Sequence, residues 1–233
     1  MPNSLELDDD LDPVELQQSL EAAFDFRFSD PEAAACQTVG DIYAILTGRF
    51  ATARDEVGRC VTAMAFYRLR RALSGLGIDT GLRPGTPLKG LSPLTIKSLL
   101  VEIGTRTGLR LPRHGASLPG TAGALSVFAG FLGLMALGVV GLHFWPVPLL
   151  TAIAGFILIW IDPGQLPADC QTIGDLAQKL AALNFGKLVA EGAEPREKHL
   201  WEALLEVLSE NSLTPKSEIH PDTLLLRKQF RAG

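Results

Sequence analysis

Charged residues are missing from one long stretch of this chain, and histidine and cysteine are scarce throughout. The chain holds four histidines and three cysteines, and no histidine lies at a metal-ligand spacing from a cysteine. The odd cysteine count of Cys36, Cys60 and Cys170 does not suit a disulfide framework and fits buried thiols in a reducing compartment. We therefore expect no metal and no other cofactor.

An excess of basic residues and the common catalytic motifs are also missing. The formal net charge of -5 argues against nucleic acid as a partner. Gly75-Leu76-Gly77 lacks the remaining glycine of a dinucleotide fingerprint, and there is no phosphate loop or nucleophile elbow. The acidic start MPNSLELDDD matches neither a secretory signal nor a transit peptide. These absences predict a protein that is not an enzyme.

The uncharged stretch runs from Thr121 to Trp160. At ~1.5 Å per residue, roughly 40 residues exceed one crossing of a ~30 Å hydrocarbon core but suffice for two. His143, Trp145, Pro146 and Pro148 occupy the expected turn. Residues 121–161 are thus predicted to form a two-span transmembrane helical hairpin in contact with the lipid bilayer.

Basic residues on one side of this hairpin predict its orientation. Three arginines precede the first span, whereas the turn has no Lys or Arg, which places both soluble segments and both termini in the cytoplasm. We expect a multi-pass protein of a bacterial inner membrane. The predicted membrane-flanking residues are Arg106, Arg110, Arg113, Trp145 and Trp160.

Small residues recur along the first span. Ala122, Ser126 and Gly130 are spaced by four, and Ala129 and Gly133 continue a neighbouring row. Such a face allows helices to approach closely. It packs either on the second span or on a second copy of the chain, and both interpretations stay open.

Two soluble segments repeat one another. Cys36–Ile42 (CQTVGDI) recurs as Cys170–Leu176 (CQTIGDL), and a Pro-x-Thr-x-Leu motif occurs at Pro84–Leu88 and at Pro221–Leu225. Each threonine of the repeated heptad is a good N-cap, with an aspartate three residues later to complete a capping box. An apolar stripe is expected to follow each cap: Val39, Ile42 and Leu46, then Ile173, Leu176 and Leu180.

The first fifty residues resemble the second half of an acyl carrier protein. The segment Asp9-Asp10-Leu11-Asp12-Pro13-Val14-Glu15-Leu16 leads to Leu20-Glu21-Ala22-Ala23-Phe24 and then to Thr38-Val39, in the order of the carrier pattern. That family attaches phosphopantetheine through a serine, but Asp10 stands at this position and a carboxylate cannot form the phosphodiester. The resemblance therefore implies a carrier-like fold without carrier chemistry at this position.

Acidic residues surround the start of the first predicted helix. Asp12 and Pro13 suit the cap and first helical position, and Glu15 would complete a capping box. Carrier proteins use an acidic face to dock on basic partner surfaces; the alternative is a solvated acidic face. The candidate partner-docking residues are Asp8, Asp9, Asp10, Asp12 and Glu15.

The repeats and the resemblance together predict an all-α fold of two carrier-like helical bundles on the hairpin. Residues 1–50 with 197–233 would form a circularly permuted carrier-like domain. Residues 57–115 with 165–188 would form a second one, split by the hairpin. In the first domain, a C-terminal apolar face of Trp201, Leu204, Leu205 and Leu208 is expected to cover Leu16, Leu20 and Phe24.

The predicted function is that of a non-enzymatic scaffold or adaptor that docks a cytoplasmic or membrane protein partner, as a homodimer or within a larger complex. One alternative is a membrane-tethered acyl carrier with its arm on Ser92, which here precedes a helix expected over Pro93–Thr105. Ser92 lacks the preceding aspartate of the carrier pattern and also suits an ordinary helix cap. A second alternative is an accessory subunit of a larger membrane complex.

Overall fold

The computed structural model describes residues 4–5, 13–51, 58–78, 81–140, 145–167 and 169–225, and they are mostly helical. This agrees with the all-α class predicted from the sequence. The chain forms two compact units. One comprises Met1–Leu88, Ile103–Pro112 and Thr172–Gly233, and the other comprises Lys89–Glu102 and Arg113–Gln171.

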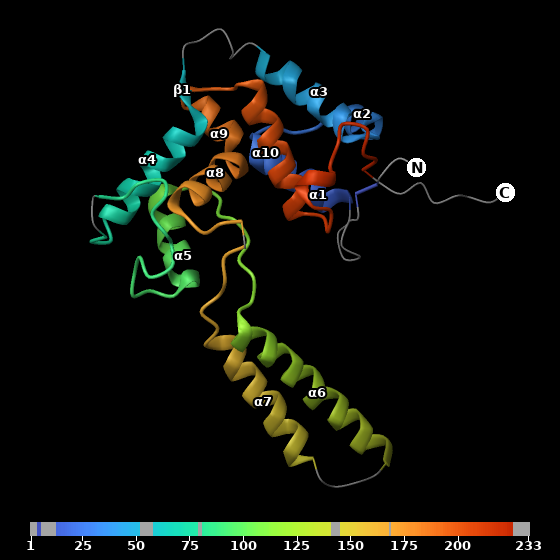
Figure 1. The fold of residues 1–233 in the computed structure, drawn as a ribbon. Coiled ribbons are helices and arrows are strands. Elements are labelled where there is room, and N and C mark those ends of the chain that lie inside the picture. Colours follow the sequence, from blue (N-terminus) through green and yellow to red (C-terminus); the bar gives the residue numbers. More distant parts are fainter. Residues whose placement is uncertain are drawn as a thin grey trace, which may run out of the picture. The chain divides into compact units, whose positions relative to one another are not determined.

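The first unit contains most of the shorter helices (Figure 1). Its helices are α1 (Pro13–Phe24), α2 (Asp30–Ala35), α3 (Val39–Phe50), α4 (Val61–Ser74), α8 (Ile173–Leu183), α9 (Phe185–Ala190), α10 (Glu197–Glu210) and the 3-10 turn η2 (Lys216–Glu218). A short parallel pair of strands, β1 (Arg59–Cys60) and β2 (Ala193–Glu194), places the start of α4 beside the chain that leads into α10.

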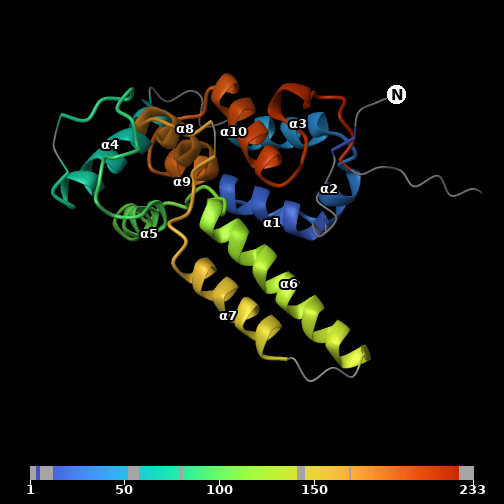
Figure 2. The ribbon, with the colours of Figure 1, turned by 60° about the horizontal axis from the view of Figure 1, so that its bottom comes forward.

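The second unit contains α6 (Leu118–Val140) and α7 (Pro146–Trp160), which run side by side in both views (Figures 1 and 2). Helix α5 (Ile96–Thr107) is divided between the two units.

Three phenylalanine rings pack against one another in the first unit. The ring centroid of Phe24 lies 6.4 Å from that of Phe50 and 5.8 Å from that of Phe185, and Phe50 and Phe185 are 5.3 Å apart. Leu16 and Leu20 are also buried, as predicted. The rings join α1, α3 and α9, so two N-terminal helices pack against a helix far along the chain.

The two repeated heptads have the predicted helix starts. Thr38 and Thr172 each cap a helix and accept a hydrogen bond from the N–H of the aspartate three residues on, at 3.2 Å in both cases. Each aspartate in turn accepts from the threonine N–H at 2.8 Å. The stripes Val39, Ile42, Leu46 and Ile173, Leu176, Leu180 are buried, which confirms both.

Each heptad also binds one of the Pro-x-Thr-x-Leu segments through its backbone. The N–H of Gly40 donates to the carbonyl of Pro221 at 2.8 Å, and the N–H of Gly174 donates to that of Pro84 at 2.7 Å. The neighbouring bonds also correspond: Val39 donates to Thr223 at 3.0 Å, and Ile173 donates to Thr86 at 2.9 Å. The same sequence pair therefore forms the same local structure twice.

The C-terminal helix α10 packs against α1, α3 and α8. Leu204 and Leu208 are buried, whereas Trp201 and Leu205 are half-buried. The ring of Trp201 meets that of Tyr43 edge-on, with centroids 5.1 Å apart. Buried Glu206 on α10 forms ion pairs with Lys179 of α8 and with Lys216, which links α10 to two other elements.

Helix α5 begins three residues later than predicted. Pro93 is not its first residue, because the hydroxyl of Thr95 accepts the N–H of Ser98 at 3.2 Å and caps the helix there. Pro146 and Pro148 are likewise outside the turn in which they were expected, since α7 begins at Pro146. His143 lies outside the described residues.

Candidate functional site

Helices α6 and α7 pack closely because glycine lies at their contacts. A Cβ on Gly123 would stand 2.7 Å from the carbonyl oxygen of Gly155, and one on Gly130 would stand 2.6 Å from that of Pro148. Gly133 also faces Pro148. The predicted small-residue face is therefore partly wrong: Gly130 and Gly133 face α7, but Ala122 and Ala129 are exposed and Gly123 takes their place.

The outward side chains of this helix pair are large, apolar and exposed. Phe128 on α6 and Phe156 on α7 are 62% and 61% exposed. Leu118, Leu125, Phe131, Met135, Val147, Leu150, Ile153 and Ile157 are also exposed. Soluble proteins rarely expose a continuous apolar surface of this kind, which marks contact with a membrane or a partner.

Among the residues that the structure describes, one helix is long and apolar enough to cross a membrane. The apolar segment Leu118–Ala136 of α6 meets this criterion, and α7 is a shorter apolar helix. Trp145 directly precedes α7 and Trp160 is its last residue; their side chains are 57% and 84% exposed. Tryptophans at opposite ends of an apolar helix are typical of the two membrane–water interfaces.

Polar contacts close the base of the hairpin. The carboxylate of Asp162, after α7, accepts hydrogen bonds from the hydroxyl and the backbone N–H of Ser117, before α6. The bond from the Ser117 hydroxyl is the main cause that holds the pKa of Asp162 below its ordinary value, and the N–H of Gly120 contributes. Further from the hairpin, Gly115 and Gln165 exchange two backbone hydrogen bonds of 2.9 Å. The carboxylate thus caps the start of α6.

The predicted flanking arginines differ in their surroundings. Only Arg113 belongs to the same unit as the hairpin. Arg106 lies in the last turn of α5. The backbone of Arg110 is bound by the side chain of Asn184, at 2.6 Å for its N–H and 2.9 Å for its carbonyl, and its guanidinium donates to the carbonyl of Ser19 at 3.3 Å. Arg110 therefore stabilises the first compact unit, the helical unit.

Of the predicted acidic docking residues, the structure describes one. Glu15 is exposed in the first turn of α1, which begins at Pro13 as predicted. Asp8, Asp9, Asp10 and Asp12 lie outside the described residues. Ser92 is half-buried, and its hydroxyl accepts the N–H of Leu94 at 3.1 Å in the loop before α5.

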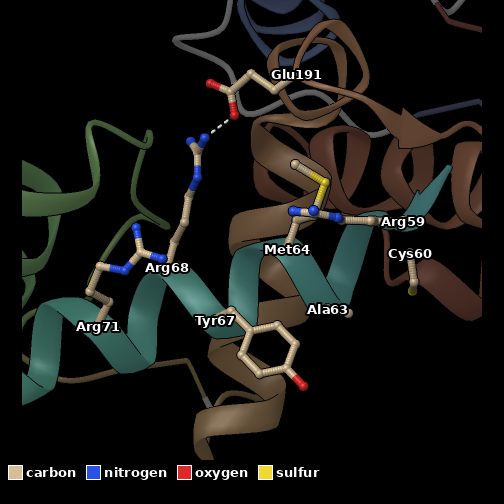
Figure 3. Close-up of a pocket in the computed structure, with 8 residues that line it drawn as sticks. All are labelled: Arg59, Cys60, Ala63, Met64, Tyr67, Arg68, Arg71 and Glu191. Carbon is tan, nitrogen blue, oxygen red and sulfur yellow. Dashed lines mark hydrogen bonds and ion pairs between the residues drawn. The ribbon is translucent and has the colours of Figure 1, made fainter.

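A cavity lined by arginines opens on α4 and was not predicted. It has a volume of about 540 Å³ and is lined by Arg59, Cys60, Ala63, Met64, Tyr67, Arg68, Arg71 and Glu191. Figure 3 shows Arg68 directed at Glu191, with Arg71 on the same side of the helix. Arg68 and Glu191 form an ion pair.

Sequence spacing predicts only part of this cavity. Met64, Arg68 and Arg71 recur at helical spacing on α4, a pattern that can be read from the sequence. Arg59 and Glu191 join them because β1 pairs with β2, with Arg59 opposite Ala193. This parallel pairing joins segments far apart in the chain and has no local signal.

No group of three or more His, Cys, Asp or Glu side chains that could hold a metal ion occurs within the described part of the chain. Comparison with known protein families, with curated proteins and with solved structures finds no match.

Proposed function

We propose that this protein is a non-enzymatic scaffold or adaptor, anchored in a membrane by the α6–α7 hairpin, that docks a protein partner at the cytoplasmic face. The observation that carries the proposal is the hairpin surface. Large apolar side chains are exposed along both helices, whereas the base is polar and hydrogen-bonded. Lipid would cover the apolar surface and leave the base in water.

Both helices would cross the bilayer. With 23 residues, α6 is about 34 Å long, enough for a ~30 Å hydrocarbon core. With 15 residues, α7 is about 22 Å long, and local thinning or residues beyond its ends would complete its span. The glycine contacts between the two helices and the tryptophans at both ends of α7 support a shared crossing.

The helical unit would supply the docking surfaces. We infer two carrier-like domains, residues 1–50 with 197–233 and residues 57–115 with 165–188. The matched hydrogen bonds of the two heptads support this, as does the packing of α10 on α1 and α3. Because Asp10 replaces the carrier serine, such domains would keep a carrier's acidic docking face without an arm. Asp8, Asp9, Asp10, Asp12 and Glu15 would contact the partner.

Removing the hairpin should release the protein from the membrane. Because Gly115 and Gln165 are hydrogen-bonded to each other, residues 116–164 can be replaced by a Gly-Ser dipeptide without separating the two segments that lead into the hairpin. We expect the full chain in the carbonate-washed membrane fraction and the shortened chain in the supernatant. A chain carrying an unrelated apolar two-helix hairpin of the same length is the control and should stay in the membrane. A folded shortened chain that remains in the membrane would place the anchor elsewhere.

The two ends of the hairpin should be accessible from opposite sides of the membrane. In a chain with its three cysteines changed to serine, single cysteines are introduced as His143→Cys or Leu213→Cys, the latter at a side chain that is 67% exposed. A membrane-impermeant thiol reagent applied to spheroplasts should label position 143, and position 213 only after permeabilisation. Labelling of position 213 alone in sealed spheroplasts would reverse the orientation.

A further inference from the structure

The cavity on α4 concentrates positive charge in a chain that is acidic overall. Three arginines and one glutamate line it, which leaves two positive charges in excess. The glutamate is paired with Arg68, and the side chains of Arg59 and Arg71 form no ion pair with any residue that the structure describes. Both are exposed, so their guanidinium groups can turn toward a bound ion.

We propose that this cavity binds a phosphate monoester. The guanidinium group presents a planar fork of N–H donors that fits phosphate oxygens in pairs. A monoester carries a charge of about −1.5 to −2 at neutral pH, which matches the two excess positive charges. A carboxylate or a phosphodiester carries one negative charge and would leave one arginine uncompensated.

The rest of the cavity suits the organic part of such a ligand. Met64 and Ala63 supply apolar lining, and Tyr67, whose side chain is 62% exposed, also lines the cavity. Tyr and Met side chains at a surface recur where proteins bind aromatic or alkyl groups. An aryl or alkyl phosphate should therefore bind more tightly than inorganic phosphate.

This site does not depend on the proposed anchoring function, because every lining residue belongs to the helical unit. The ligand could be a soluble ester or a lipid with a phosphate monoester headgroup. Both sources share the chemistry that the arginines recognise, and the experiment separates them.

The test uses the full chain in nanodiscs of phosphatidylcholine, titrated calorimetrically with phenyl phosphate and with inorganic phosphate. Phenyl phosphate should bind more tightly than inorganic phosphate. Arg59→Ala and Arg71→Ala should each weaken it about tenfold, the size expected for one charge-assisted contact. Arg71→Lys should restore part of the loss, because it keeps the charge without the fork. Below pH ~6 the ester loses its second charge and binding should weaken.

Two further variants test whether the affinity for phenyl phosphate depends on the charges of this cavity. Glu191→Gln removes the competing carboxylate and frees Arg68, so it should strengthen binding, opposite in sign to the arginine variants. Arg27→Ala removes an exposed arginine outside the cavity and should leave affinity unchanged. In a parallel arm, nanodiscs contain phosphatidic acid: loss of phenyl phosphate binding there assigns the site to a lipid headgroup, and unchanged binding assigns it to a soluble ester.

Three results would overturn the proposal. One is the absence of phenyl phosphate binding in phosphatidylcholine discs. Another is an affinity for phenyl phosphate that is the same in the Arg59→Ala, Arg71→Ala and Arg27→Ala proteins. The third is binding of an oligoglutamate peptide without binding of phenyl phosphate, which would make the cavity a protein-docking surface.

Discussion

Gly186→Ala should destabilise the helical unit more than alanine at any other glycine that the structure describes. A Cβ on Gly186 in α9 would stand 1.9 Å from the carbonyl oxygen of Phe24 and 2.1 Å from its carbonyl carbon. Backbone atoms cannot rotate away as a side chain can. Phe24 is also fixed, since its ring is buried against Phe50 and Phe185. Separating α1 from α9 would open this core, so we expect a loss of about 3 kcal/mol or more.

The measurement is chemical unfolding of the full chain in detergent, followed by circular dichroism. Gly48→Ala is the matched control, because Gly48 lies inside α3 and a Cβ there would meet nothing within 4 Å. Alanine favours a helix over glycine by up to ~1 kcal/mol, so this control should be neutral or stabilising. If Gly186→Ala unfolds at the same denaturant concentration as the unmodified chain, α1 and α9 are not in this close contact.

The sequence predicted local features where one short segment determines the structure. The helix starts at Thr38 and Thr172 were predicted because cap and carboxylate lie three residues apart, and the structure has both capping boxes. The buried stripes that follow are equally local. The uncharged run predicted adjacent apolar helices, although α7 proved shorter than a full span.

Predictions failed where two residues could each begin a helix, and where the packed face of a helix depended on its rotation about its own axis. Pro93 favours a first helical position, but the hydroxyls of Thr95 and Ser98 define the start of α5 instead. In the hairpin, the predicted row included Ala122, whereas Gly123 meets α7. One residue turns a helix by about 100°, so a row of small residues in a wholly apolar helix does not identify the packed face.

The arginine cavity was not predicted because its walls come from separate parts of the chain. Helical spacing predicts that Arg68 and Arg71 share a face, but no pattern in the sequence pairs β1 with β2. The net charge of -5 also gave no indication of the cavity, because it does not report a local excess of arginine. Composition averages over the whole surface, whereas a binding site depends on a few side chains within one cavity.

The glycine of the repeated heptad has the same role in both copies. A Cβ on Gly40 would stand 2.9 Å from the carbonyl oxygen of Pro221, and one on Gly174 would stand 2.9 Å from that of Pro84. These oxygens are the acceptors of the hydrogen bonds from the same glycines. A methyl group would push each Pro-x-Thr-x-Leu segment away and lengthen both bonds of its pair.

Gly40→Ala and Gly174→Ala should therefore each destabilise the protein by about 2 kcal/mol, which combines overpacking with weakened hydrogen bonds. Their costs should agree closely because the two geometries agree. Gly48→Ala again serves as the control and separates this contact from any effect of alanine on α3 itself.

Hydrogen exchange should place the two effects in different parts of the chain. Gly40→Ala should speed exchange at positions 39, 40 and 225, whose N–H groups bond between the first heptad and the C-terminal Pro-x-Thr-x-Leu segment, and leave Ile173 and Gly174 protected. Gly174→Ala should do the reverse. Faster exchange at Leu225 in the Gly40→Ala protein would show that the first heptad and the C-terminal Pro-x-Thr-x-Leu segment form one structural element, although they are far apart in the chain. Unchanged protection of Leu225 in that protein would show that the first heptad folds without the C-terminal segment, and the permuted carrier-like domain would then have to be abandoned.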